Sequence, residues 1–200
     1  EDGIRDDLVT GVQTCALPIW APVYVKHQIV HNPVAVSEVE SKGAITVEKV
    51  SEIPDNSVVV FSAHGSPPED YKLAKEKNIT VIDATCPLVT KVHNEAKKYS
   101  KEGKKIILVG HKGHQEVIGT SGQADMKIID DREKFDLDKS KDEDVIVLSQ
   151  TTLSVRDTQD TISKIKNVHP KAVVRNDICY ATTNRQEVTV KLAKKVDLIL

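Results

Sequence analysis

Cys86 has the sequence context of a metal ligand or a nucleophile. Residues 81–93 read VIDATCPLVTKVH: an apolar run ends, a short turn follows, and Cys86 stands immediately before Pro87. Proline suits the first position of a helix because the N–H that it lacks would have no partner there. Cys86 is therefore predicted at a helix N-terminus, where backbone N–H groups and the helix dipole favour a thiolate. The alternative is a small core residue, since unpaired cysteines are often buried.

Cys179 repeats this context. Each of the two cysteines follows an aspartate by two or three residues and precedes a polar turn into a helix. Two thiolates from separate βα units could share one metal centre. Zinc takes four ligands, or three and a water, whereas a cubane iron–sulfur cluster with one thiolate missing has one iron open to substrate. Two unrelated core cysteines are the alternative.

A second group of residues suits anion binding and proton transfer. His111, His114 and Glu116 form an HxxHxE pattern, which is not the H-E-x-x-H motif of zinc proteases. A histidine that holds an anion and a glutamate that delivers a proton fit this pattern better. His31 and His64 flank the same expected crevice, and histidines with helix N-termini at one edge suit a diphosphate. The alternative is a set of histidines in surface loops.

Thr151 and Thr152 follow the apolar run at 144–149 within SQTTLS. Their hydroxyls either belong to the same polar edge or form a simple helix N-cap. The sequence contains neither a Walker A lysine motif nor GxGxxG, so a nucleotide cofactor is disfavoured.

The elements that must position these residues alternate between strands and helices. Strands are predicted at 23–25, 44–48, 57–62, 80–84, 104–110, 126–130, 144–149, 172–174 and 196–200, and helices at 35–42, 67–77, 87–102, 155–168 and 186–195. This alternation predicts an α/β fold with parallel sheets and helical crossovers. Ligands of such sheets bind beyond the carboxyl ends of the strands, and there the polar residues described above are expected.

Composition excludes several classes of protein. The 200 residues are 39% hydrophobic and 29% charged, enough for the core of one domain or two small ones. A net charge of -2 without a basic block, and only seven aromatic residues, argue against a nucleic-acid partner. No apolar run approaches the ~20 residues of a membrane span. Three widely spaced cysteines indicate a reducing cytosol rather than a disulfide framework.

Residues 1–20 do not continue the alternation of strands and helices that is predicted for the rest of the chain. They show neither helical nor strand periodicity, and GVQTCALPI looks like a translated sequencing-adapter remnant. We expect residues 1–20 to be a foreign or unstructured segment, and for that reason we give Cys15 no role. The chain ends on VDLIL, which is predicted to be a buried strand without a closing helix, so we expect truncation at that end as well.

Taken together, six segments closely resemble the 4-hydroxy-3-methylbut-2-enyl diphosphate reductase family, from about Ala21 to Leu200. They are VYVKHQIVHN, FSAHG, DATCPLVTKVH, GHKGHQEVIGT, LSQTTLSV and NDICYATTNRQE. The resemblance implies an iron–sulfur oxidoreductase of the non-mevalonate isoprenoid pathway in the bacterial cytoplasm. Such an enzyme removes the hydroxyl group of its diphosphate substrate by reduction with a [4Fe–4S] cluster, and ferredoxin or flavodoxin supplies the electrons.

The resemblance also implies a three-lobed arrangement around a central cluster, with a first lobe over 21–86, a second over 87–175 and the start of a third over 176–200. It implies the following roles: cluster ligands Cys86 and Cys179; diphosphate-site histidines His31, His64 and His114; Thr151 near the hydroxymethyl end of the substrate; and Glu116 as the proton-delivering carboxylate.

Two family features are missing from this sequence. The first is the Gly-Phe-Cys-Ala-Gly-type loop that carries the first cysteine of the family, and the second is the Ser-x-Asn diphosphate motif. We therefore expect the 200-residue chain to be inactive by itself. The competing hypotheses are an α/β binding module without catalysis and a zinc hydrolase that uses Cys86, Cys179 and His114.

Overall fold

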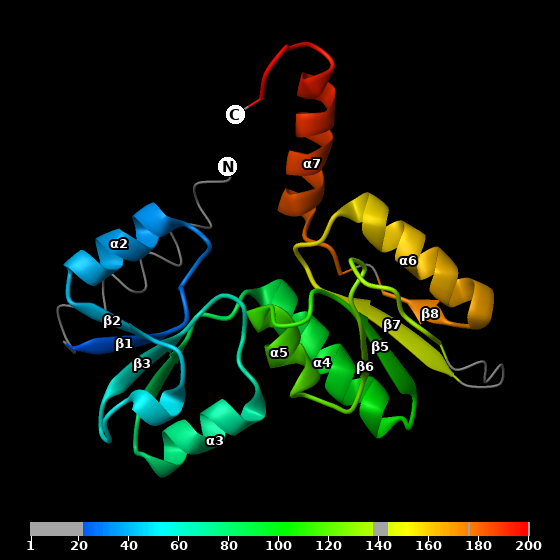
Figure 1. Cartoon of the computed structure of the whole chain (residues 1–200). Coiled ribbons are helices and arrows are strands. Elements are labelled where there is room, and N and C mark those ends of the chain that lie inside the picture. Colours follow the sequence, from blue (N-terminus) through cyan, green and yellow to red (C-terminus); the bar gives the residue numbers. More distant parts are fainter. Residues whose placement is uncertain (1–21, 138–143, 176, 200) are drawn as a thin grey trace. The chain divides into compact units, whose positions relative to one another are not determined.

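The computed structural model describes residues 22–137, 144–175 and 177–199. The expectation for residues 1–20 lies outside these ranges. The chain divides into two compact units, each built on one four-stranded parallel sheet (Figure 1). The first unit holds the described residues up to Thr90 together with Ile118–Gln123, and the second holds Lys91–Val117 and the described residues from Ala124 on. The lobe boundaries expected from the sequence stay a prediction.

The sheet of the first unit has the strand order β2-β1-β3-β4. Its elements are β1 (Val23–Lys26), α2 (Pro33–Ser41), β2 (Ala44–Val47), the 3-10 helix η1 (Val50–Glu52), β3 (Val58–Phe61), α3 (Pro68–Glu76) and β4 (Thr80–Asp83). Helices cover both faces of this sheet (Figure 1). Val60 of β3 belongs to the cluster that contains Val39 of α2, whereas Val59 and Phe61 belong to the cluster that contains Ala74 of α3. Burial on both faces explains why the strand is an uninterrupted apolar run.

The sheet of the second unit has the equivalent order β6-β5-β7-β8. Its strands are β5 (Lys105–Val109), β6 (Lys127–Ile129), β7 (Val145–Ser149) and β8 (Val173–Val174), and the remaining helices are α4 (Pro87–Lys101), α5 (Gln115–Ser121), α6 (Val155–Val168) and α7 (Tyr180–Ala193). Residues of α4 and α5 belong to both units. Leu108 of β5 packs with Val92 of α4, and Val109 packs with Ile165 of α6, so the two faces again alternate along the strand.

The predicted fold class is confirmed. Every strand pair in both sheets is parallel, and α-helices form most of the connections between successive strands. None of the helices in the described part of the chain combines the length and the apolar content needed to cross a bilayer.

Two predicted elements near the end of the chain are wrong. The last helix, α7, begins at Tyr180 rather than at Gln186. The described residues 196–199 form no strand, although a strand was expected over VDLIL. A strand needs a neighbouring strand to satisfy its backbone N–H and C=O groups, and the described residues supply no such neighbour to this segment.

Candidate functional site

Glu116 and Thr151 form the centre of the candidate site in the second unit. Glu116 lies in the first turn of α5 and is only 2% exposed. The backbone N–H of Thr151 donates to its Oε1 at 2.6 Å, and the Thr151 hydroxyl donates to its Oε2 at 3.1 Å. The structure thus joins two residues that the sequence placed 35 positions apart.

Burial raises the pKa of Glu116 to about 7. Removal from water penalises the ionised carboxylate, and the two hydrogen bonds from Thr151 only partly offset this penalty. The negative charge of Asp177 raises the pKa further. A carboxyl group with a pKa near neutrality can hold a proton and release it, as a general acid requires.

Asp177 is a site residue that we did not single out from the sequence. Its side chain is fully buried, and its Oδ1 accepts a hydrogen bond from Lys91 Nζ at 3.1 Å. Its Oδ2 accepts one from the backbone N–H of Ser149 at 3.4 Å. Burial raises the pKa of this carboxyl as well, and Lys91 opposes the rise. The sequence feature that could have identified Asp177 is the aspartate that precedes each of the two cysteines, and we assigned no role to those aspartates.

His114 contacts the same turn through its ring. Its Nδ1 accepts a hydrogen bond from the backbone N–H of Glu116 at 3.2 Å. In its neutral form the ring therefore carries its proton on Nε2, which can donate to an anion.

Gly110 allows the loop between β5 and α5 to lie close to the end of β7. A Cβ atom on Gly110 would lie 2.6 Å from a methyl carbon of Val117 and 3.3 Å from the Gln150 side chain. The Gln150 side chain accepts a hydrogen bond from the His111 backbone N–H at 3.1 Å. Gly110 and Gln150 therefore position the loop that carries His114, and neither was predicted as a site residue.

Cys86 lies at the N-terminus of α4, as predicted. Its backbone N–H donates to Ala63 O at 3.0 Å, and its carbonyl accepts from the N–H of Thr90 at 2.9 Å, as the N-cap residue of a helix does. Its side chain is half-buried and carries a thiol.

Cys179 has the same backbone role at the start of α7. Its N–H donates to Thr151 O at 2.8 Å, and its carbonyl accepts from the N–H of Thr183 at 3.0 Å. It is a half-buried thiol like Cys86. Each unit therefore places one thiol at a helix N-terminus, and each cysteine is held to the loop that follows a strand.

The two remaining predicted residues lie together in the first unit. The rings of His31 and His64 are 4.3 Å apart between centroids, and Ser62 Oγ contacts His64 Nδ1 at 3.2 Å. The structure thus brings the predicted residues together in two groups. They are His31, His64 and Cys86 in the first unit, and His114, Glu116, Thr151 and Cys179 in the second.

Comparison with known proteins gives consistent results. Residues 10–200 match the profile of the family described as LytB protein. This match includes residues 10–20, which we expected to be foreign or unstructured. The chain is 46% identical to the 4-hydroxy-3-methylbut-2-enyl diphosphate reductase of Actinobacillus pleuropneumoniae serotype 3 (strain JL03), covering 97% of this chain and 65% of that protein. It is 44% identical to the reductase of the same name from Cutibacterium acnes (strain DSM 16379 / KPA171202), covering 98% and 62%.

Solved structures show the same similarity. The E-1-hydroxy-2-methyl-but-2-enyl-4-diphosphate reductase from Plasmodium falciparum superposes with a TM-score of 0.88 at 38% identity, over 94% of this chain and 61% of that one. A second structure, named (E)-4-hydroxy-3-methyl-but-2-enyl diphosphate reductase, has a TM-score of 0.74 at 30% identity. The chain therefore spans a little under two thirds of the length of the curated relatives that it matches.

Proposed function

Because this chain belongs to the LytB protein family, we propose that it carries residues of the active site of a 4-hydroxy-3-methylbut-2-enyl diphosphate reductase. The proposed reaction breaks the C–O bond of the hydroxymethyl group, adds two electrons and two protons, and releases water. Its products are isopentenyl and dimethylallyl diphosphate. The observation that carries the proposal is the buried Glu116 carboxyl, whose pKa of about 7 suits proton delivery near neutral pH.

Glu116 supplies a proton in this proposal, and Thr151 fixes the direction of its carboxyl group. Both carboxyl oxygens contact Thr151, one through the backbone N–H and one through the hydroxyl. The threonine therefore positions the acid, and in this proposal it would also contact the hydroxymethyl end of the substrate. A fixed acid avoids the cost of ordering a mobile side chain as the reaction proceeds.

Three histidines bind the diphosphate in this proposal. The Nδ1 atom of His114 accepts from the Glu116 backbone, so its Nε2 is the ring atom that would donate to a phosphate oxygen. The rings of His31 and His64 lie against each other in the first unit, tilted by 49°. Ring N–H donors of this kind form charge-assisted hydrogen bonds to phosphate oxygens.

Cys86 and Cys179 would be ligands of a [4Fe–4S] cluster. Their sulfur atoms are of the soft type that iron–sulfur clusters require, and both are half-buried thiols at equivalent helix starts. The two thiols therefore fit such a group as part of a ligand set, and a set of three needs one further cysteine. When bound, a cluster of this type supplies electrons, which come from ferredoxin or flavodoxin, and an open iron that acts as a Lewis acid. Thiols of this kind are kept reduced in the bacterial cytoplasm, where we place the protein.

Anaerobic reconstitution with iron and sulfide tests the ligand assignment. Bound iron and sulfide, with the broad visible absorption of thiolate-to-iron charge transfer, would support the assignment. Cys86→Ser and Cys179→Ser should each abolish or strongly reduce both signals, and Cys15→Ser, the matched control, should leave them unchanged. Stoichiometric zinc without iron that is lost in Cys86→Ser and Cys179→Ser would instead favour a hydrolase, and the absence of metal at the cysteines would favour a binding module.

The catalytic assignment is tested in the context of a complete relative. In the Actinobacillus reductase, the part that matches residues 22–199 is replaced by residues 22–199 of this chain. The kcat of this chimera is measured with a reduced dye as electron donor. Glu116→Gln should lower kcat by about 100-fold or more while iron and sulfide contents stay constant. Glu102→Gln removes an exposed carboxylate at the end of α4 and is the control that should keep full activity. An unchanged kcat in the Glu116 variant would remove its assignment as the acid.

A further inference from the structure

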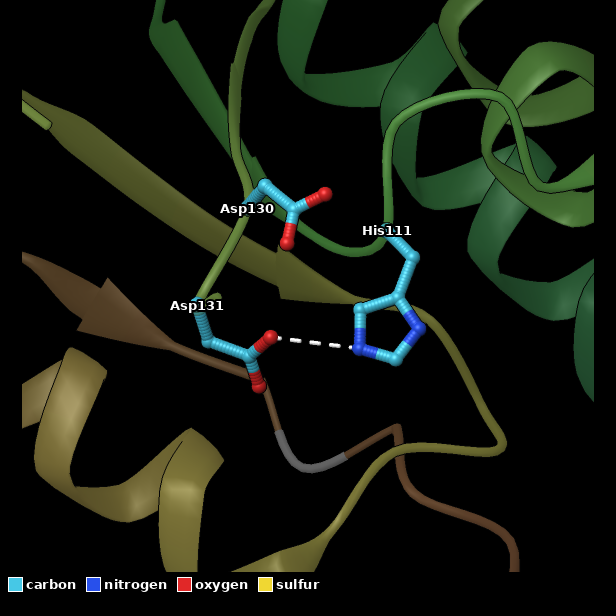
Figure 2. A group of neighbouring side chains, drawn as sticks. All are labelled: His111, Asp130 and Asp131. Carbon is cyan, nitrogen blue, oxygen red and sulfur yellow. Dashed lines mark ion pairs between the residues drawn. The ribbon is translucent and has the colours of Figure 1, made fainter. Parts of the chain in front are cut away.

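Three potential metal ligands gather at the ends of β5 and β6, and the proposed reaction uses none of them. His111 follows β5, and Asp130 and Asp131 follow β6 (Figure 2). The two strands are parallel neighbours, so both loops leave the same edge of the sheet of the second unit. One ligand atom from each of the three side chains lies within 4.8 Å of the others.

Asp131 is the group that points to a ligand. Its side chain is only 5% exposed, yet its Oδ1 has no hydrogen-bond partner among the described residues. Such an oxygen is costly to bury unless something positive satisfies it. It faces His111 Nε2 at 3.2 Å, as the dashed line in Figure 2 shows. Two atoms that each lie about 2.1 Å from a tetrahedral Zn²⁺ are about 3.4 Å apart, so the observed spacing suits two ligands of one ion.

Asp130 supplies a second carboxylate, and in this structure a cationic side chain pairs with it. Arg132 contacts both of its oxygens, at 2.8 and 2.6 Å, and the backbone N–H of Lys112 donates to it at 2.8 Å. The Arg132 side chain is 58% exposed, so it can turn into water and leave an oxygen of Asp130 for a cation.

We propose that His111, Asp130 and Asp131 bind one divalent transition-metal ion of the Zn²⁺ class, with water as the fourth ligand. An imidazole combined with carboxylates suits zinc and its neighbours, whereas Mg²⁺ prefers oxygen ligands alone. The ion exchanges with Arg132 at Asp130, because the guanidinium and the metal compete for the same carboxylate. It would also fix His111, which stands three residues before His114. This site is separate from the two cysteines and does not depend on the proposed reaction.

The test is a titration of the whole chain with Zn²⁺ in a variant in which Cys15, Cys86 and Cys179 are all replaced by serine, so that no thiol competes. Calorimetry should show one Zn²⁺ per chain, and Co²⁺ should give the absorption of a site with nitrogen and oxygen ligands. Mg²⁺ should not compete at equal concentration. Failure to bind Zn²⁺ in this chain would overturn the proposal and leave a plain histidine–aspartate ion pair.

Single substitutions in the same background assign the ligands. His111→Gln and Asp131→Asn should each weaken Zn²⁺ binding at least about tenfold, a loss that even an outer-shell partner can cause. Asp125→Asn, at an exposed aspartate in the loop before β6, is the matched control and should not change it. Circular dichroism checks that each variant folds. If Asp131→Asn does not fold, His111→Gln still provides the test, because the His111 side chain is partly exposed and its replacement disturbs the core less. Binding that survives both ligand substitutions would overturn the proposal.

Arg132→Gln gives a result that an adventitious surface site would not show. This substitution removes the cation that competes for Asp130, so Zn²⁺ binding should tighten by several-fold. Weaker binding in this variant would contradict the proposed exchange, because it would mean that Arg132 supports the site instead of competing with the metal.

Discussion

The buried carboxyl of Glu116 should make the stability of the chain fall as the pH rises. Its pKa is raised from an ordinary 4.5 to about 7, mainly because it is buried. Between these two values the native state holds a proton that the unfolded chain releases. The native state therefore binds more protons, and the free energy of unfolding must decrease as the pH rises through this window.

The size of this effect follows from the displacement of the pKa. At about 1.36 kcal/mol for each pH unit, a rise from 4.5 to about 7 corresponds to about 3 kcal/mol, of which roughly 2.5 kcal/mol is lost between about pH 5 and about pH 8. Glu116→Gln keeps an acceptor for the Thr151 N–H and cannot ionise. The free energy of unfolding of the wild-type chain should therefore fall by about this amount relative to the variant across that range.

Urea unfolding followed by circular dichroism at several pH values measures the difference. Because Asp177 is present in both proteins, its own titration largely cancels from the comparison. Glu102→Gln removes an exposed carboxylate and should follow the wild-type chain at every pH. Parallel curves for the wild-type chain and Glu116→Gln would refute the argument that burial raises the pKa of Glu116.

Three further substitutions test individual contacts. Thr151→Val removes the hydroxyl that donates to Glu116, so the midpoint of Glu116 titration, followed by carboxyl NMR, should rise; a fall would contradict the role of this hydrogen bond. Gly110→Ala places a carbon 2.6 Å from a methyl of Val117 and should cost about 1–3 kcal/mol in urea unfolding. That cost should shrink in a Val117→Ala background, and an equal cost in both backgrounds would exclude the clash. Ser154→Ala removes the side chain that caps α6 and should cost about 1 kcal/mol, whereas an unchanged unfolding midpoint would show that the cap contributes nothing.

The regular elements with two buried faces or one clear apolar stripe could be predicted from the sequence. The run at 57–62 contains β3, because both faces of that strand meet a hydrophobic cluster. The helix at 155–168 has the bounds of α6, because Ser154 caps it and buried residues such as Thr161 and Ile165 recur on one side. In both cases local pattern and tertiary burial agree.

The start of α7 could not be predicted in this way. This helix buries none of its residues in the described chain, so no apolar period marks its first turns. The threonines and the asparagine in 180–185 are also common in turns. The helix begins at Tyr180 because the Cys179 carbonyl accepts a hydrogen bond from the backbone N–H of Thr183. Helix propensities of single residues do not predict such a bond.

The contacts inside the candidate site are equally invisible to sequence patterns. Lys91 and Asp177 are 86 positions apart, and their ion pair depends on where α4 and the loop after β8 meet. The cysteines and histidines, by contrast, could be placed at strand ends, because each follows a recognisable apolar run. Residue types and strand ends were therefore predictable, whereas the pairing of buried charges was not.

The two sheets share one strand order, but the loops at equivalent positions carry different residues. Ser62 and Ser149 are both buried and close equivalent apolar runs, and two positions later one chain segment has His64 and the other has Thr151. The same loop position thus carries an imidazole ring in the first unit and, in the second, a hydroxyl that donates to the Glu116 carboxyl. A strand order used twice in this way lets each copy change the residues of its loops independently, without altering either core.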